Sequence, residues 1–496
     1  MSEAAVDVPL VAAKEPAGLA PLRPVPADLA PLRPVPAARP SPWTPLNALG
    51  TLASGVSFVA LFFVLAAVLY ALCGGLAKLL GDNPLRSGGL GQSIGALVGI
   101  LLLFVMITAT LLTIAERKWS ALMQDRIGPN RARLPIPFLK DRALRGIPHL
   151  VADVLKMLTK EDFLPIKSSA LLFNLAPILA FAPAFALVMV VPFGPDATIF
   201  DQRVALQIAH VDPGVLVLFA TASIAVYGTA LAGWSSNNKF ALLGGLRASA
   251  QLVSYEVSLG LTLVGVILLY GTLQLDQMAA AQGASYALAR SGGDDLLFGL
   301  LPAWGVVFQP IGFLMYFTAA GAEVKRAPFD LPEAESEIIG YFVEYSGLKF
   351  GMFMIAEFVE VVVLSATFVV IFFGGWHLPW VEPLLAPHVT PLAFAIIQVG
   401  FFLLKVVFLC WVQLVVRWTF PRFRYDQLMH LGWKILLPLS LANVLLTGFL
   451  LLWGGRPAMA WAGIVEWVVL LALIGWTVQS KRAAPAAAGH DSHATH

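Results

Sequence analysis

The stretch GYFVEYSGLKFGMFMIAEFVEVVV (residues 340–363) opens one of the longest apolar runs in this 496-residue chain. The run extends from 340 to 373 and so exceeds the ~20 residues that an α-helix needs to cross a lipid bilayer. Because a backbone in lipid must satisfy its own hydrogen bonds, the run predicts a transmembrane helix. Four side chains that are charged at neutral pH nevertheless interrupt it, namely Glu344, Lys349, Glu357 and Glu360.

The composition of the whole chain agrees with a membrane setting. Its mean hydropathy is +0.79, and only 12% of its residues are charged, against an average of about 25% in soluble proteins. The net charge of +2 gives no reason to expect nucleic acid as a partner. The composition therefore predicts an integral membrane protein.

About ten segments are long and apolar enough to cross a bilayer, which predicts an all-α polytopic membrane protein. They lie near 52–79, 94–115, 169–192, 213–234, 249–270, 299–321, 340–373, 391–416, 432–453 and 457–478. With the N-terminus inside, the inner segments hold 25 Lys and Arg residues and the outer ones five. Because positive charge is retained on the cytoplasmic side, both termini are expected there.

The loop between the second and third predicted spans contains GIPHLVADVLKMLTKED (146–162). Its apolar residues recur at helical spacing while Asp153, Lys156 and Lys160 fall elsewhere, which predicts an amphipathic helix in the membrane interface. A helix packed on a soluble partner fits the pattern equally well.

Carboxylates are concentrated around one predicted membrane entrance. Six of them, from Glu323 to Glu344, face only Lys325 and Arg326 in the sequence, and Glu337 and Glu344 are two helical turns apart and so predicted on one face. A carboxylate at the bilayer centre costs roughly 2.5–3.5 kcal/mol, so such residues mark a pathway or a pair. Repulsion and desolvation favour shared protons in such a group.

Other charges lie within the predicted spans and leave two interpretations open. Glu256 lies in QLVSYEVSLGL and Lys405 in FFLLKVVFLCW. Lys349 or Lys405 paired with a glutamate would explain them structurally. For Glu360 and Lys405 this pairing and a functional role have equal weight.

Long motifs in this chain resemble the H subunit of proton-pumping NADH:quinone oxidoreductase, respiratory complex I. These motifs, which occur in the family's order, are AERKWSALMQDRIGPN (115–130), ADVLKMLTKED (152–162), YGTALAGWSSNNKFALLGGLRASAQLVSYE (227–256), AEVKRAPFDLPEAESEIIGYFVEYSG (322–347), AEF (356–358) and RWTFPRFRYDQLMHLGWKILLPLSLAN (417–443). The resemblance implies a subunit that joins the peripheral and membrane arms, forms part of the quinone tunnel and couples quinone reduction to proton translocation.

The resemblance also assigns residues to two roles. The residues expected to line the quinone tunnel are Glu116, Arg117, Arg126, Glu323, Arg326, Phe329 and Asp330. Those expected to form a proton pathway are Glu256, Glu333, Glu335, Glu337, Glu344 and Glu357. No residue is expected to be catalytic in the isolated chain, and no metal site is expected.

The resemblance further implies that quinone, such as ubiquinone, is the substrate, while FMN and iron–sulfur clusters reside in partner subunits. The expected location is the bacterial inner membrane, with the other complex I subunits and lipid as partners. A related membrane subunit of an energy-converting hydrogenase is the nearest alternative. A free-standing ion transporter is a further one, although no internal repeat supports it.

The organisation expected from this resemblance has five parts. Residues 1–50 form a flexible Pro/Ala-rich arm, 51–93 an extra helix and loop, 94–453 the eight-helix family core, 454–480 a second extra helix and 481–496 a disordered polar tail. Residues 131–145 are longer and more basic than the family's usual link, and His149 stands where glutamine is typical. Subunit packing is the expected role of the extra helices.

Overall fold

The computed structural model describes residues 45–83, 89–126, 128–130, 146–283, 302–333, 337–338, 340–379 and 381–488. The chain divides into two units, residues 1–57 and 58–496. The first unit is described only where helix α1 (Pro45–Leu79) begins. Most of the predicted arm and all of 131–145 lie outside the described residues.

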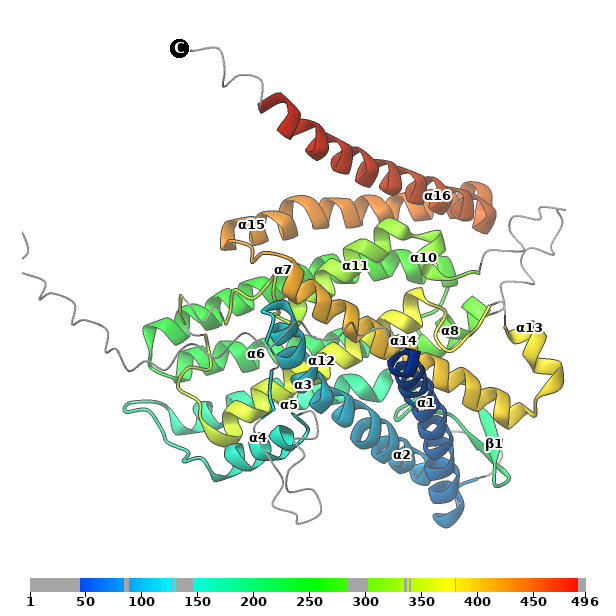
Figure 1. Ribbon diagram of the computed structural model, residues 1–496, viewed down its shortest axis with the longest axis horizontal. Helices are drawn as coiled ribbons and strands as arrows, with labels where there is room; N and C mark the ends of the chain where they lie inside the picture. The colour runs from blue at the N-terminus through cyan, green and yellow to red at the C-terminus, as the bar shows by residue number, and fades with distance from the viewer. Residues whose placement is uncertain are drawn as a thin grey trace, which may run out of the picture. The chain divides into compact units, whose positions relative to one another are not determined.

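Long helices dominate the described residues, which confirms the all-α class (Figure 1). Within the described ranges, eight helical segments are long and apolar enough to span a membrane. They are Ser57–Leu79 in α1, Leu90–Met123, α5 (Ala170–Val190), α6 (Gly214–Ser235), α7 (Lys239–Tyr270), α12 (Gly347–Phe372), α14 (Pro391–Thr419) and Tyr425–Ser480. Leu90–Met123 joins α2 (Leu90–Ala96), the π-helix η1 (Leu97–Met106) and α3 (Ile107–Met123). Tyr425–Ser480 joins α15 (Tyr425–His430), the π-helix η6 (Leu431–Leu436) and most of α16 (Leu437–Ala488).

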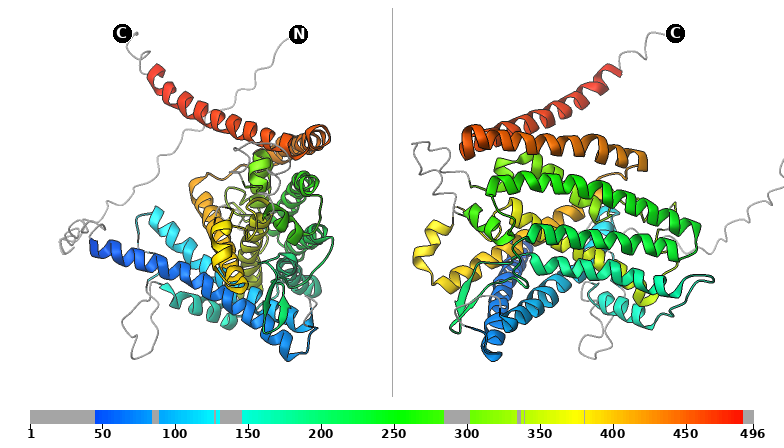
Figure 2. Two further views of the ribbon diagram at one scale, coloured as in Figure 1. Left: turned by 90° about the vertical axis from the view of Figure 1, so that its right-hand side faces the viewer. Right: turned by 180° about the vertical axis from the view of Figure 1, so that it is seen from behind.

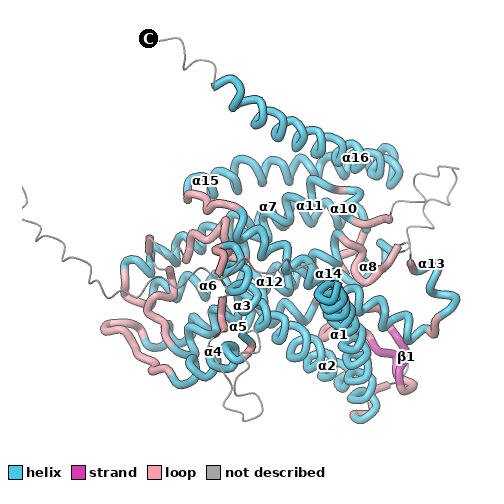
Figure 3. The backbone as a smooth tube through the Cα atoms, in the orientation of Figure 1, coloured by secondary structure: helices cyan, strands magenta, loops and turns pink. Residues whose placement is uncertain are grey.

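Shorter elements connect these spans. The helices are α4 (Pro148–Thr159), α8 (Leu275–Gly283), α10 (Gly305–Phe308), α11 (Pro310–Glu323), α13 (Glu382–Leu385) and the 3-10 helix η5 (Ala386–His388). The strands β1 (Ala197–Ile199) and β2 (Gln202–Val204) form an antiparallel hairpin in which Thr198 is paired with Arg203 (Figure 3).

Ten separate spans are not seen among the described residues, for two reasons. The span predicted at 299–321 is broken at Gln309, which separates α10 from α11. The spans predicted at 432–453 and 457–478 both lie in the stretch Tyr425–Ser480, in which η6 leads into α16 and Gly455, with a φ of 65° and a ψ of −157°, separates two helices. The helix continues to Ala488, past the predicted start of the tail.

Helix α12 also begins later than its apolar run suggests. Ser346 is extended and Gly347 has a φ of 58°, so the helix starts there and residues 340–346 form turns. The prediction that Glu337 and Glu344 share a helical face is therefore wrong, because neither residue is in a helix. Once started, α12 is the most buried span, packed against α3, α5 and α14.

Small residues allow the layer of α5, α6 and α7 to pack closely, with α6 between the other two (Figure 2). A Cβ atom on Gly228 of α6 would lie 2.5 Å from the backbone nitrogen of Ala180 in α5. Gly233 of α6 similarly faces Gly245 of α7. Such close backbone approach is typical of membrane helices, which gain dispersion energy where side chains are small.

The predicted amphipathic helix is confirmed as α4. Val151, Val154 and Leu155 on one face are exposed, whereas the side chain of Met157 lies against Gly351 of α12. The exposed apolar face fits either of the two expected surroundings, lipid or a soluble partner.

Candidate functional site

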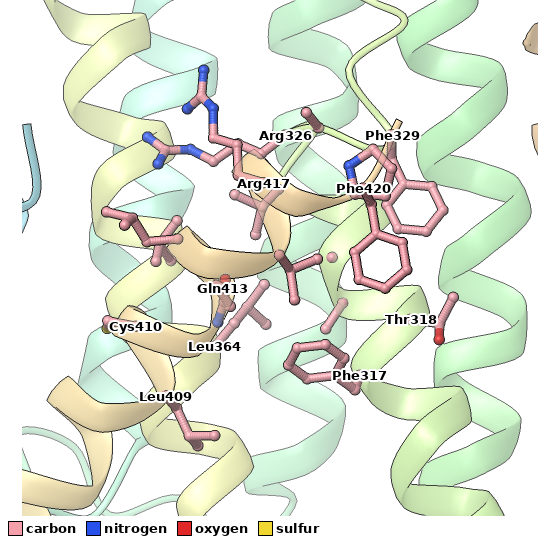
Figure 4. Close-up of a pocket in the computed structure, with 18 of the residues that line it drawn as sticks. Phe317, Thr318, Arg326, Phe329, Leu364, Leu409, Cys410, Gln413, Arg417 and Phe420 are labelled. Carbon is pink, nitrogen blue, oxygen red and sulfur yellow. The ribbon is translucent and has the colours of Figure 1, made fainter. Parts of the chain in front are cut away.

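An apolar cavity of about 360 Å³ lies between α3, α11, α12 and α14. In Figure 4 the guanidinium groups of Arg326 and Arg417 lie at one end of it, while Phe317 and Leu409 lie toward the other. Its remaining lining residues are Leu112, Glu116, Thr318, Ala320, Gly321, Val324, Ala327, Pro328, Phe329, Val361, Leu364, Phe368, Cys410, Gln413, Leu414, Val416, Phe420, Phe423 and Leu431. An apolar cleft with a few convergent polar groups is typical of a small-molecule site.

The charged end of this apolar cavity is built on Glu116. Its Oε1 atom accepts hydrogen bonds from Nη1 of Arg326 and, at 3.0 Å, from Nη1 of Arg417. The Arg326 guanidinium also stacks on the Phe358 ring, 4.1 Å from its centroid. Because the Glu116 and Arg326 side chains are only 13% and 15% exposed, each charge needs the other to offset its desolvation.

The loop after α11 is held in place by its backbone. The Gln251 side chain donates hydrogen bonds to the carbonyls of Ala322 (2.7 Å) and Phe329 (3.0 Å). Asp330 accepts a 2.6 Å hydrogen bond from Arg422. Burial raises the pKa of Asp330, and the nearby Arg422 charge opposes that rise. These contacts place the Phe329 ring in the wall of the apolar cavity.

A second cavity of about 510 Å³ reaches two further predicted tunnel residues, Arg117 and Arg126. It is lined by Glu116, Arg117, Ser120, Arg126, Gly128, Pro129, Asn130, His149 and Trp418. An ion pair of 2.6 Å joins Arg117 of α3 to Asp153 of α4. Glu116 lines both cavities, so the interface helix and the apolar cavity meet around one carboxylate.

A small acidic cavity of about 20 Å³ lies beside the apolar one, and Leu364 lines both. Among the described residues that line it, three are carboxylates, Glu256, Glu323 and Glu360, and one is the buried cation Lys325. The hydroxyl of Ser223 donates a hydrogen bond to Glu256. The structure thus places Glu323, predicted for the tunnel, with the acidic residues.

Further acidic residues gather around Tyr341. The Lys325 ammonium lies 5.8 Å from the centroid of the Tyr341 ring, whose hydroxyl donates a 3.3 Å hydrogen bond to Glu357. Burial, followed by the Glu357 charge, raises the pKa of Glu333 well above its ordinary value of 4.5. Lys325 therefore stands between the acidic cavity and the pair formed by Glu333 and Glu357.

Two described residues predicted for the proton pathway, Glu337 and Glu344, are not gathered with this cluster. Glu337 is 56% exposed and pairs with Arg247 at 3.4 Å. Glu344 accepts a 2.8 Å hydrogen bond from Asn238. Both lie in the turns that precede α12, whereas Glu335 lies outside the described residues.

The structure adds residues that sequence reasoning missed or left open. Arg417 and Arg422, which pair with Glu116 and Asp330, were visible only as charges in RWTFPRFR. Glu360 lines the acidic cavity. Of the two interpretations left open for it, a structural pair with a lysine or a functional role, this position favours the functional role.

Neither lysine pairs as expected. Lys349 pairs with Asp162 at 2.7 Å rather than with a glutamate. The Lys405 ammonium donates hydrogen bonds to the carbonyls of Phe373, Gly375 and His377 at 2.9–3.0 Å. Both contacts favour structural roles, and the Lys405 contacts place its charge at the C-terminus of α12.

The long apolar helices and the buried ionisable residues define a multi-pass membrane protein. A family model described as NADH dehydrogenase matches residues 96–448. The H 1 subunit of NADH-quinone oxidoreductase from Geobacter metallireducens is 43% identical over 354 residues, which are 71% of this chain and 94% of that protein. The corresponding H subunit from Salinibacter ruber is 42% identical over 69% of this chain and 91% of its own. NADH-quinone oxidoreductase subunit 8 of Rhodothermus marinus is 42% identical over 71% of this chain and 95% of its own.

The chain belongs to the NADH dehydrogenase family, and the resemblance to the H subunit of NADH-quinone oxidoreductase is confirmed. The matched range 96–448 excludes α1 and the part of α16 that follows Gly455.

Proposed function

We propose that this chain is the quinone-binding, proton-coupling membrane subunit of an NADH:quinone oxidoreductase. The observation that carries the proposal is the contact between two unlike cavities. An apolar cavity, closed at one end by Glu116 and two arginines, shares Leu364 with a cavity lined by three carboxylates. The names of the relatives support the same reaction.

The apolar cavity suits a quinone because a lipid-soluble ring needs apolar walls and a few polar groups that orient it. Phe317, Phe329 and Phe420 supply the aromatic walls, and Arg326 and Arg417 supply hydrogen-bond donors at one end. Reduction of a quinone to a quinol takes up two electrons and two protons. The electrons come from FMN and iron–sulfur clusters in partner subunits.

The coupling step uses Lys325 and the acidic residues. Negative charge that develops on a reduced quinone near Arg326 repels the carboxylates on the adjoining loop. Lys325 follows α11 with a φ of 60° and is buried, with Glu360 in the acidic cavity on one side and the Tyr341 ring on the other. Displacement of this loop therefore changes the distance from the Lys325 charge to both groups. Protons then redistribute among Glu256, Glu323, Glu357 and Glu360. Moving one proton against ~150 mV costs about 3.5 kcal/mol, which quinone reduction supplies.

The proposal includes a location and partners. The chain lies in the bacterial inner membrane with both termini cytoplasmic, as its positive charges indicate. Peripheral-arm subunits bind near the cavity that holds Arg117 and His149. Purification in mild detergent tests this assembly: NADH-oxidising subunits should accompany the chain, and nickel-ligand subunits would instead identify the hydrogenase alternative.

A matched pair of glycine variants tests the site itself. A Cβ on Gly321 meets only the Phe329 ring at 3.6 Å, so Gly321→Leu directs its larger side chain toward the apolar cavity. Gly260→Leu on α7 is the control, because nothing lies within 4 Å of its Cβ position. In membranes with the assembled complex, Gly321→Leu should raise the quinone KM about tenfold.

Electron transfer from NADH to ferricyanide, which needs no quinone site, should remain unchanged in both variants. An unaltered quinone KM in the assembled Gly321→Leu complex would show that quinone does not use this cavity.

A further inference from the structure

The helical segment 457–480 of α16, called here the C-terminal arm, lies beyond the family-matched range. Its direction differs from that of the preceding part of α16 because Gly455 interrupts the helix (Figure 1). The arm is in contact with the chain near α10 and α11, where the predicted sixth span is broken.

The break leaves backbone groups without their usual partners. In an uninterrupted helix the carbonyl of Val306 would accept a hydrogen bond from residue 310, but Pro310 has no N–H group. The N–H of Ile311 is the first one available in α11. The preceding Gln309 provides no side-chain cap, and its amide nitrogen donates a 2.9 Å hydrogen bond to Thr447. In lipid such groups require partners from neighbouring helices.

Three residues of the C-terminal arm meet these groups. The indole nitrogen of Trp467 donates a 3.0 Å hydrogen bond to the carbonyl of Val306. The adjacent Glu466 accepts a 3.2 Å hydrogen bond from the N–H of Ile311, at the positive end of α11. One turn earlier, a Cβ on Gly463 would lie 2.1 Å from the carbonyl oxygen of Val307, so glycine is required for this approach.

Helix α11 in turn carries the cavity walls. Phe317, Thr318, Ala320 and Gly321 line the apolar cavity, and Glu323 at its end lines the acidic one. A cap on Ile311 fixes where this helix begins and thereby where its wall residues lie.

We propose that the C-terminal arm is a built-in positioning element for the quinone site, in which Glu466 and Trp467 complete the backbone hydrogen bonds of the break between α10 and α11. The functional half of this statement rests on the proposed function. Glu466 is a positioning residue that acts through α11.

The test compares two glycines of the same arm in the purified complex. Gly463→Ala forces the arm away from Val307, whereas Gly475→Ala meets nothing within 4 Å and serves as the control. Hydrogen exchange of peptides from 305–323 should accelerate about fivefold in Gly463→Ala, the change expected when a typical helix cap is lost, and remain unchanged in Gly475→Ala. Equal exchange in the two variants would overturn the proposal.

A second comparison isolates the cap. Glu466→Ala removes the acceptor for Ile311, while Glu466→Gln keeps one and should restore wild-type behaviour. Positioning predicts a severalfold higher quinone KM with unchanged kcat in Glu466→Ala, whereas a loss confined to the amount of complex would overturn positioning. Trp467→Phe gives the same comparison if Glu466→Ala fails to assemble.

The two hypotheses fail differently. If hydrogen exchange in α11 is faster in Gly463→Ala but the wild-type complex reduces no quinone, the contact between the C-terminal arm and α11 is supported and the proposed function is contradicted. Unchanged exchange in a complex that reduces quinone would contradict the positioning role alone.

Discussion

The apolar and acidic cavities share Leu364 but differ in how far their carboxylates are balanced by cations. In the apolar cavity, Glu116 is matched by two guanidinium groups, so its charges form a fixed pair. In the acidic cavity, Lys325 is the cation among three carboxylates of the described residues. A matched charge serves as a scaffold, whereas an unmatched group of carboxylates must share protons. Side by side, these arrangements suit ligand binding and proton exchange.

The largest expected effect comes from breaking the matched charges. Glu116→Ala leaves Arg326 and Arg417 without their common partner, and removal of one member of a buried pair costs about 3–5 kcal/mol. Assembled complex and quinone reduction should fall to about a tenth or less of wild type. Asp196→Ala is the control, because its pair with Arg203 is exposed and worth about 0–1 kcal/mol. Normal assembly and turnover in Glu116→Ala would refute a scaffold role.

The acidic cavity should respond through coupling. Glu360→Gln keeps the size of the side chain but removes an exchangeable proton beside Lys325. Proton pumping should slow on the order of tenfold, with pumping reduced more than quinone reduction. Glu360→Asp keeps a carboxyl group and should retain coupling. Proton uptake and quinone reduction are measured together in vesicles, and an unchanged ratio in Glu360→Gln would exclude this residue from the pathway.

A smaller effect should depend on pH. Burial and Glu357 raise the pKa of Glu333, so the folded state holds this proton more tightly than the unfolded state. The unfavourable contribution of Glu333 to stability is therefore absent below the ordinary value of 4.5 and grows as pH rises toward the raised value. Glu333→Gln should exceed wild type in Tm by a margin that increases with pH, on the order of 1–2 °C. A margin that shrinks with pH would contradict this assignment.

The smallest effect should belong to Glu337. Its side chain is exposed and its pair with Arg247 is long, so the pair contributes about 0–1 kcal/mol. Glu337→Gln should leave quinone reduction, pumping and Tm near wild type at every pH. A loss of pumping comparable to that in Glu360→Gln would show that Glu337 belongs to the proton pathway. It would also show that exposure does not separate the two glutamates by function.

The spans were the most predictable feature of the fold. Their length and apolarity follow from the thickness of the bilayer, so α5, α6 and α14 lie close to their predicted ranges. Helix α7 ends where its span was predicted to end but begins ten residues earlier, at Lys239 rather than at 249. The exceptions are local: the break at Gln309, the interruption at Gly455 and the late start of α12 at Gly347. Hydropathy averages over such positions and does not register a single residue's backbone angles.

The candidate site was predicted less completely. The resemblance selected Glu116, Arg326 and Phe329, which the structure brings together around one cavity. The ion-pair partners of these residues could not be read from the sequence. Glu116 pairs with Arg417, 301 residues away in the chain, and Asp330 pairs with Arg422, 92 residues away. Exposure likewise separated Glu337 from Glu360, although both are glutamates near an apolar run.

The sequence by itself determined that the chain crosses a membrane, where its long helices lie and that acidic residues crowd one entrance, because these properties are local in the chain. Only the tertiary structure decided which of those acids are matched by arginine, which share a cavity with Lys325 and which face outward. The physical reason is that a charge's behaviour depends on the distance to its partner and on its burial, and both are set by contacts between residues far apart in the sequence.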